Sequence, residues 1–194
     1  MSLEMRIYAP SFDDSLTSSW IARLNSLDMQ CEIHPDFSFN TQIGFLPFKV
    51  SLTRSEHQQL IGVPFFTGFE FYISDFDLGQ EIKAIKPKQT FIARLLKVRS
   101  EPVFFVSPNI DEKLASCRKV ISCVWYSDDI LELRIASLSA LILAKLADGI
   151  CSYPADNIWY TKDDSLEFAL KEIEEFETSL QPEQLKVHKF EKWL

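Results

Sequence analysis

The sequence predicts a single α+β domain: a mixed, mainly antiparallel sheet of about six strands, a buried central helix, and further helices near both termini. Three observations support this prediction. The chain has 194 residues, which suffice for one ordinary domain and are too few for two large ones. Residues 131–147 form a long apolar segment that is typical of a buried helix. Several shorter segments alternate between apolar and polar residues, as half-buried strands do.

The N-terminal part begins with a predicted helix over residues 14–27. Its apolar residues recur at helical spacing after an Asp-rich start, and they are Leu16, Trp20, Leu24 and Leu27. A short strand is expected over residues 30–34, ending at Pro35. We leave Met1-Ser2-Leu3 out of the prediction because these residues resemble the remnant of an expression vector.

The next part is rich in phenylalanine, with nine of the sixteen phenylalanines of the chain between Phe37 and Phe76. Alternation predicts antiparallel strands over residues 46–52 and 69–73, joined by a turn near residues 62–64. A loop near residues 77–79 would close this meander. Residues 89–99 fit a helix or a strand, and we favour the helix. The apolar runs over residues 103–106 and 120–126 are predicted to be buried strands.

The C-terminal part starts with the central helix, which is expected to stop at Gly149. Its uncharged stretch has about half the length that a bilayer requires, so we predict no membrane span. Short strands are expected over residues 150–154 and 158–161, around a polar turn. A further helix is predicted from a cap at Asp164 to residue 180, where Pro182 ends it. Residues 182–194 would then form a last helix with Val187, Phe190 and Leu194 on one side, a tail that needs either the core or a partner to cover it.

Charge narrows the classes of function. The formal net charge is −8, which repels the phosphate backbone, so we expect no nucleic acid as a partner. Residues 81–99 hold six basic residues against one acid, which we interpret as a solvated face. The four cysteines form no C-x-x-C pair and the N-terminus has no apolar secretion signal, so we expect a cytoplasmic protein. His34, His57 and His188 are in no known ligand spacing, and we predict neither a metal site nor a cofactor.

Paired carboxylates are the polar groups that recur. The adjacent pairs Asp13-Asp14, Asp128-Asp129 and Asp163-Asp164 precede predicted helices, where aspartates cap the first turn. The spaced pair Asp75 and Asp77 is expected to share one face near Glu70. These carboxylates suit a cation, a proton or a partner surface, although a solvated loop explains them as well.

The segment LSALILAKLADGICSYPADNIWY, residues 138–160, combines a buried helix, an A-D-G turn, a short strand and an aromatic pair. In this it resembles the C-terminal half of several small bacterial proteins, some of which are immunity proteins that neutralise toxins. The resemblance implies an acidic cytoplasmic protein that acts by binding a toxin. It implies no particular functional residue, because the shared positions are structural.

We therefore expect a cytoplasmic binding protein without catalytic activity, whose partner is a protein such as a basic toxin. The first candidates for its surface are Glu70, Asp75 and Asp77, and the second are Asp128 and Asp129. The alternative is a small-molecule-binding protein or hydrolase with a cleft lined by residues 37–76. A homodimer through the C-terminal tail is compatible with either function.

Overall fold

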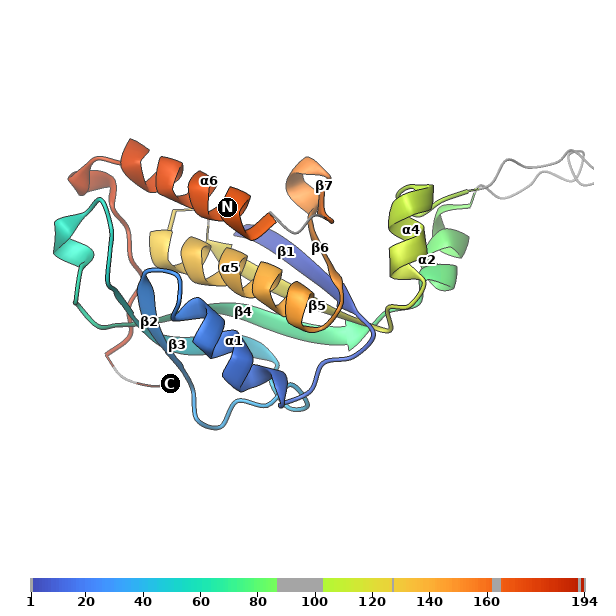
Figure 1. Cartoon of the computed structure of the whole chain (residues 1–194), viewed down its shortest axis with the longest axis horizontal. Helices are drawn as coiled ribbons and strands as arrows, with labels where there is room; N and C mark the ends of the chain where they lie inside the picture. Colours follow the sequence, from blue (N-terminus) through green and yellow to red (C-terminus); the bar gives the residue numbers. More distant parts are fainter. Residues whose placement is uncertain (1, 87–102, 127, 162–164, 192, 194) are drawn as a thin grey trace, which may run out of the picture.

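The computed structural model describes residues 2–86, 103–126, 128–161, 165–191 and 193. It contains a seven-stranded sheet in the order β2-β3-β4-β5-β1-β6-β7, with the helices over residues 16–24, 130–146 and 165–179 packed on one face (Figure 1). The predicted α+β class is confirmed. All neighbouring strands are antiparallel, and the parallel pairing among the described residues is limited to isolated bridges outside the strand pairs.

The strands are β1 (Ser2–Ala9), β2 (Met29–Ile33), β3 (Gly44–Leu52), β4 (Phe65–Asp75), β5 (Lys119–Tyr126), β6 (Ile150–Tyr153) and β7 (Ile158–Tyr160). The described helices are α1 (Leu16–Leu24), α2 (Leu78–Ile85), α4 (Pro108–Leu114), α5 (Ile130–Leu146) and α6 (Ser165–Ser179). Short 3-10 turns lie at Gln58–Leu60, Pro154–Asp156 and Pro182–Gln184. The predicted helices over residues 14–27, 131–147 and 164–180 and all predicted strands except one correspond to these elements.

The strand missing from the prediction is β1, which lies near the centre of the sheet between β5 and β6. It pairs with β5 along its whole length, from Ser2 opposite Tyr126 to Ala9 opposite Lys119. Ser2 and Leu3 therefore belong to the sheet, and leaving them out of the prediction removed the start of a central strand.

The core lies between the sheet and α5, which Figure 1 shows crossing the sheet with α1 and α6 beside it. Every residue from 130 to 144 except Leu133 is buried, as the sequence predicted for the central helix. The phenylalanine-rich strands supply the opposite wall. The ring of Trp20 on α1, for example, lies 5.6 Å from the ring of Phe48 and 6.2 Å from that of Phe71.

A second, smaller apolar cluster lies at one end of the sheet, under α2 and α4 (Figure 1). The sequence predicted a loop near residues 77–79, and this is wrong because α2 begins at Leu78. The carboxylate of Asp77 accepts hydrogen bonds from the backbone N–H groups of Gly79 and Gln80, which caps the helix. The ambiguous residues 89–99 lie outside the described part of the chain.

The predicted strand over residues 103–106 is also wrong. The backbone N–H groups of Phe105 and Val106 donate to the buried carboxylate of Asp111, at 2.7 and 3.0 Å. Because a side chain on α4 satisfies these groups, the segment needs no neighbouring strand. Its apolar run packs instead against the cluster under α4, where Phe105 contacts Phe76.

The C-terminal tail is not the predicted helix. After the 3-10 turn it runs extended along the sheet, and the backbone N–H of Phe190 donates to the carbonyl of Phe66 at 2.8 Å. This part of β4 has a free edge, since the pairing between β4 and β5 begins only at Glu70. Phe190 packs on Phe45 and Val187 packs on the core, so the chain covers its own tail. A homodimer through the tail stays a prediction without support.

No helix among the described residues is long and apolar enough to cross a bilayer.

Candidate functional site

The structure separates the three carboxylates predicted to share a face. Glu70 and Asp75 are five positions apart on β4, and side chains alternate along a strand, so the two point to opposite faces of the sheet. Glu70 accepts a hydrogen bond from the phenol of Tyr72 at 2.9 Å, and Asp75 forms an exposed ion pair with Lys119 at 2.7 Å. Asp77 caps α2, and these backbone hydrogen bonds hold the pKa of its carboxyl below the ordinary value despite some desolvation.

The second predicted pair, Asp128-Asp129, lies at the start of α5 as expected. Asp129 is the N-cap residue, and its Oδ1 accepts from the backbone N–H of Glu132 at 2.8 Å. Asp128 points outward and pairs with Lys186 of the tail at 2.7 Å. Of the other adjacent pairs, Asp13 accepts from the backbone of Ser15, while Asp163-Asp164 lies outside the described residues.

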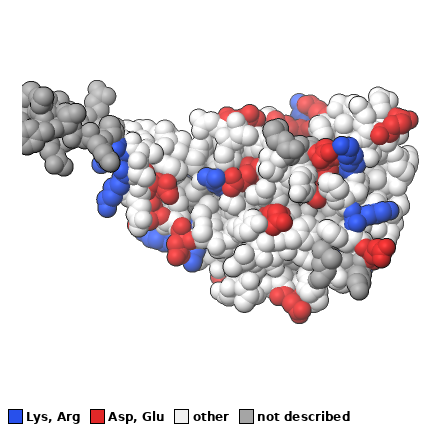
Figure 2. Space-filling model, turned by 180° about the vertical axis from the view of Figure 1, so that it is seen from behind, with Lys and Arg blue, Asp and Glu red and all other residues white. Residues whose placement is uncertain are grey.

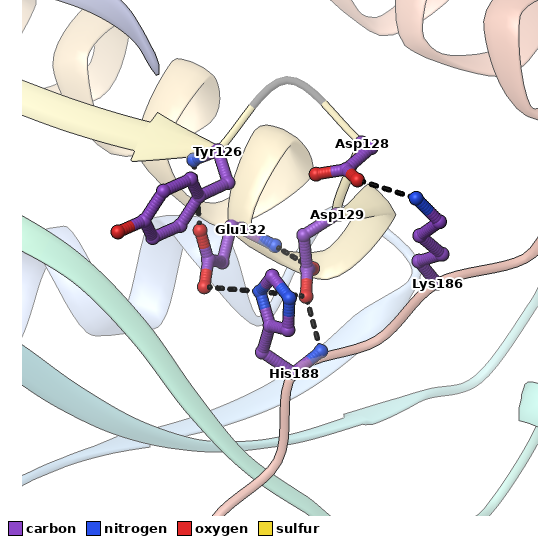
Figure 3. A network of polar contacts seen from close by, with 6 residues as sticks. All are labelled: Tyr126, Asp128, Asp129, Glu132, Lys186 and His188. Atoms are coloured by element: carbon purple, nitrogen blue, oxygen red, sulfur yellow. Dashed lines mark hydrogen bonds and ion pairs between the residues drawn. The ribbon is translucent and has the colours of Figure 1, made fainter. Parts of the chain in front are cut away.

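A cluster that the sequence did not predict surrounds Asp129. We call Asp129, Glu132 and His188 the carboxylate–histidine cluster (Figure 3). The Nδ1 atom of His188 lies 3.3 Å from Oδ2 of Asp129 and 3.3 Å from Oε1 of Glu132. One ligand atom from each residue falls within 4.8 Å of the others. The cluster joins the first turn of α5 to the C-terminal tail.

Neighbouring groups hold the two carboxylates in place. The backbone N–H of His188 donates to Oδ2 of Asp129, and the backbone N–H of Tyr126 donates to Oε2 of Glu132 at 2.9 Å (Figure 3). The ring of Tyr126 packs edge-on against the imidazole of His188 at 5.6 Å. Each carboxylate thus has a fixed orientation, with one oxygen facing the imidazole.

Burial dominates the electrostatics of the cluster. The side chain of Asp129 is 0% exposed and that of Glu132 is 6% exposed, whereas that of His188 is 49% exposed. Desolvation raises the pKa of Asp129 above its ordinary value, although backbone hydrogen bonds from Glu132 and His188 oppose this. Desolvation also raises the pKa of Glu132, and the nearby charge of Asp129 adds to the effect. The cluster therefore holds two carboxylates in a poorly solvated place, which favours a compensating positive charge.

The sequence carried only part of the signal for this cluster. Asp129 was explained as a capping residue before the apolar helix, without any site, and Glu132 was not singled out. His188 is 56 residues further along the chain, so no ligand spacing connected it to them. The tail brings the imidazole to α5, and the tail was predicted to be a helix.

The face of the sheet opposite α5 is the other candidate site. Its middle part exposes seven side chains of β1, β4 and β5, which we call the open strip: Glu4, Arg6, Glu70, Tyr72, Ser122, Val124 and Tyr126. Glu70, Val124 and Glu4 form one cross-strand row, and Tyr72, Ser122 and Arg6 form the next. Figure 2 shows the molecule from this side, with acidic and basic side chains dispersed among neutral ones.

The polar groups of the open strip form pairs. Arg6 donates to both carboxylate oxygens of Glu4, at 2.8 and 3.0 Å. Partial burial tends to raise the pKa of Glu4, but the hydrogen bond and charge of Arg6 prevail, and the pKa lies below its ordinary value. Tyr72 is 44% exposed and Tyr126 is 58% exposed. The strip thus presents two accessible aromatic rings beside carboxylates that already accept hydrogen bonds from side chains of the strip.

The alternative function, a small-molecule-binding protein or hydrolase, requires a cleft lined by residues 37–76. Among the cavities lined by described residues are three with volumes of about 670, 420 and 260 Å³. Of the segment over residues 37–76, only Phe76 borders one of them. Instead, the rings of Phe37, Phe39, Phe48, Phe69 and Phe71 contact one another and Trp20 in the core.

The four cysteines are free and buried, as the sequence indicated for small core residues. Burial raises the pKa of the Cys31 thiol to about 12 and raises that of Cys151 further. Because the thiolate is the reactive form, these groups are poor nucleophiles.

Comparisons with known proteins give no match to a family model, to a curated protein or to a solved structure. The resemblance of residues 138–160 to immunity proteins therefore stays a prediction.

Proposed function

We propose that this chain is a cytoplasmic binding protein without catalytic activity, which docks a basic protein on its open strip. The observation that carries this proposal is the pair of exposed tyrosines, Tyr72 and Tyr126, on the sheet face opposite α5, where Tyr72 is hydrogen-bonded to Glu70. An immunity protein that binds a toxin is the form of this function that the sequence resemblance implies.

The composition of the strip supports docking. Tyrosine and arginine are enriched at protein interfaces and among the residues that contribute most to binding. Tyr72 donates its phenol hydrogen to Glu70, and this bond raises the pKa of the phenol. A side chain already fixed by a hydrogen bond loses less conformational entropy when a partner covers it.

The charge supports a basic partner. A net charge of −8 attracts a cationic protein from a distance, and such steering raises the association rate at low salt. The pairing of Glu4 with Arg6, and of Glu70 with Tyr72, fits docking better than proton transfer, because both carboxylates already have hydrogen-bond donors.

Protection of cells tests the proposal. Cells that make the chain would be challenged with a basic toxin encoded beside its gene, and survival would be compared between two double variants. The test variant is Glu70→Gln with Tyr72→Ala. The control is Glu167→Gln with Phe168→Ala, which removes an exposed carboxylate and an exposed ring from α6 on the helix side.

We expect the Glu70/Tyr72 variant to lose protection while it remains folded, and the control to protect as the original chain does. Equal protection by both variants, or no protection by the original chain, would contradict the proposal. Asp77 is left unchanged because its loss would remove the cap of α2 together with any partner contact.

A further inference from the structure

We propose that the carboxylate–histidine cluster binds a zinc-class divalent cation, with one oxygen each from Asp129 and Glu132 and Nδ1 of His188 as ligands. This inference does not rest on the proposed function, although Tyr126 of the open strip packs on His188. The sequence predicted no metal site, because the histidines are in no known ligand spacing, and this proposal departs from that prediction.

The first argument is the separation of the ligand atoms. Zinc in proteins is held at about 2.0–2.1 Å by carboxylate oxygens and imidazole nitrogens in a tetrahedral arrangement. Ligand atoms in such a site are therefore about 3.3 Å apart. Nδ1 of His188 lies at 3.3 Å from Oδ2 of Asp129 and at 3.3 Å from Oε1 of Glu132. All three ligand atoms lie within 4.8 Å of one another, so a cation between them requires the two carboxylate oxygens to approach by at most about 1.5 Å.

The second argument is charge. Two carboxylates with exposed fractions of 0% and 6% contact the same nitrogen, Nδ1 of His188. Two cationic side chains of the neighbouring elements are engaged elsewhere: Lys186 pairs with Asp128 at 2.7 Å, and Arg134 donates to both carboxylate oxygens of Glu177. A divalent cation would neutralise both carboxylates where water solvates them poorly, which offsets their desolvation.

The third argument is preorganisation. Asp129 is held by two backbone contacts, since its Oδ1 accepts from the N–H of Glu132 and its Oδ2 accepts from the N–H of His188. Glu132 is held through Oε2, which accepts from the N–H of Tyr126 and leaves Oε1 facing the imidazole. Such supporting hydrogen bonds orient ligands in metal sites. His188 is half exposed, so the cluster has a route to solvent and room for water as a fourth ligand.

The ligand set favours zinc over calcium or magnesium. Imidazole nitrogen suits zinc and other late transition metals, whereas calcium and magnesium prefer six or more oxygens. Binding would also fasten the tail, because His188 follows closely on Lys186, whose carbonyl accepts from the N–H of Ile130 on α5. The competing explanation of the same geometry is a direct contact of Nδ1 of His188 with both carboxylates, with no metal between them.

Metal titration of the full chain separates these explanations. The metal-free protein would be titrated with Zn²⁺ by calorimetry and with Co²⁺ by visible absorption, in which a tetrahedral site gives strong bands. We expect one equivalent to bind. His188→Ala, Asp129→Asn and Glu132→Gln should each weaken binding by about 10-fold or more, because each removes a ligand.

Two variants serve as controls, and circular dichroism would confirm that every variant is folded. His34→Ala removes a histidine that contacts Trp193, and Asp128→Asn removes the exposed carboxylate next to Asp129. Both should bind Zn²⁺ as the original chain does. Failure of the original chain to bind, or unchanged affinity in His188→Ala, would overturn the proposal and leave the direct contact of His188 with the two carboxylates as the explanation.

Discussion

Gly149 shows why the conformation of a single residue matters after the central helix. The sequence suggested this glycine as the left-handed residue that ends the helix, but Asp148 has that conformation, with φ of 50°. Gly149 is needed for a different reason. A Cβ atom there would lie 2.3 Å from the carbonyl oxygen of Tyr8, because β6 begins directly against β1.

We therefore predict opposite effects for two neighbouring substitutions. Gly149→Ala should lower the free energy of unfolding by about 1–3 kcal/mol, since the new methyl group forces the backbone of β1 aside. Asp148→Gly should leave it unchanged or raise it by up to about 1 kcal/mol, because glycine adopts positive φ without strain. Urea unfolding of both variants measures this, and a larger loss in Asp148→Gly would contradict the explanation.

The candidate residues were predictable to different degrees. The capping role of Asp129 followed from its place before an apolar helix. The sequence did not reveal that Glu132 is buried, nor that His188 reaches it, because both facts depend on where the tail runs. Of the residues of the open strip, the sequence singled out only Glu70. Glu4 and Arg6 lie on β1, which was not predicted, and the others lie on the solvent-facing side of β4 and β5, where nothing marked them as a site.

At the scale of elements, α5 and α6 are joined by a buried ion pair. The guanidinium of Arg134 donates to both carboxylate oxygens of Glu177, at 2.9 and 2.8 Å, and the side chains are 4% and 2% exposed. His57, near the Gln58–Leu60 turn, has its Nε2 atom 2.8 Å from the backbone carbonyl of Glu177. Three segments distant in sequence thus meet at one residue of α6.

Two variants of this ion pair separate the cost of an unpaired buried charge from the loss of the pair itself. Glu177→Ala should lower the free energy of unfolding by about 3–5 kcal/mol, because it leaves the Arg134 charge buried without a partner. The double variant Arg134→Met with Glu177→Leu should lose clearly less, since no charge remains buried. Denaturant unfolding of the two proteins is the measurement. A double variant less stable than Glu177→Ala would contradict this explanation.

The tail gives a second prediction at this scale. A chain that ends at Gln181 should unfold at lower urea concentration, with a loss of about 2–4 kcal/mol, because Phe45 and Phe66 lose their contacts with Phe190 and Trp193. Light scattering should give both chains the same number of subunits, since the tail packs on its own domain. A fall in subunit number on truncation would instead show that the tail joins two copies.

Elements with a strong periodic pattern were predicted correctly, and those whose conformation depends on a distant partner were not. The helix over residues 131–147 and the strands of the phenylalanine-rich part carry their own signal. Residues 103–106 and the tail were misassigned because Asp111 and the free edge of β4, respectively, satisfy their backbone groups. Neither contact leaves a periodic trace in the sequence.

At the scale of the whole molecule, the fold has two unlike sides. Helices α1, α5 and α6 cover one face of the sheet and complete the core (Figure 1). On the other face, α2 and α4 cover one end and the tail lies along the other, which leaves the open strip between them. The α+β class followed from the sequence, but this asymmetry depends on the strand order, which the sequence did not specify.

The central claim is that the open strip is where a protein partner docks. The most direct measurement is photo-crosslinking in cells, with a photoreactive amino acid at position 72, at position 126 or, as a control on α6, at position 168. We predict one discrete adduct from positions 72 and 126 and none from 168, and mass spectrometry would show whether the captured protein is basic. No adduct from the strip, or the same adducts from all three positions, would contradict the account.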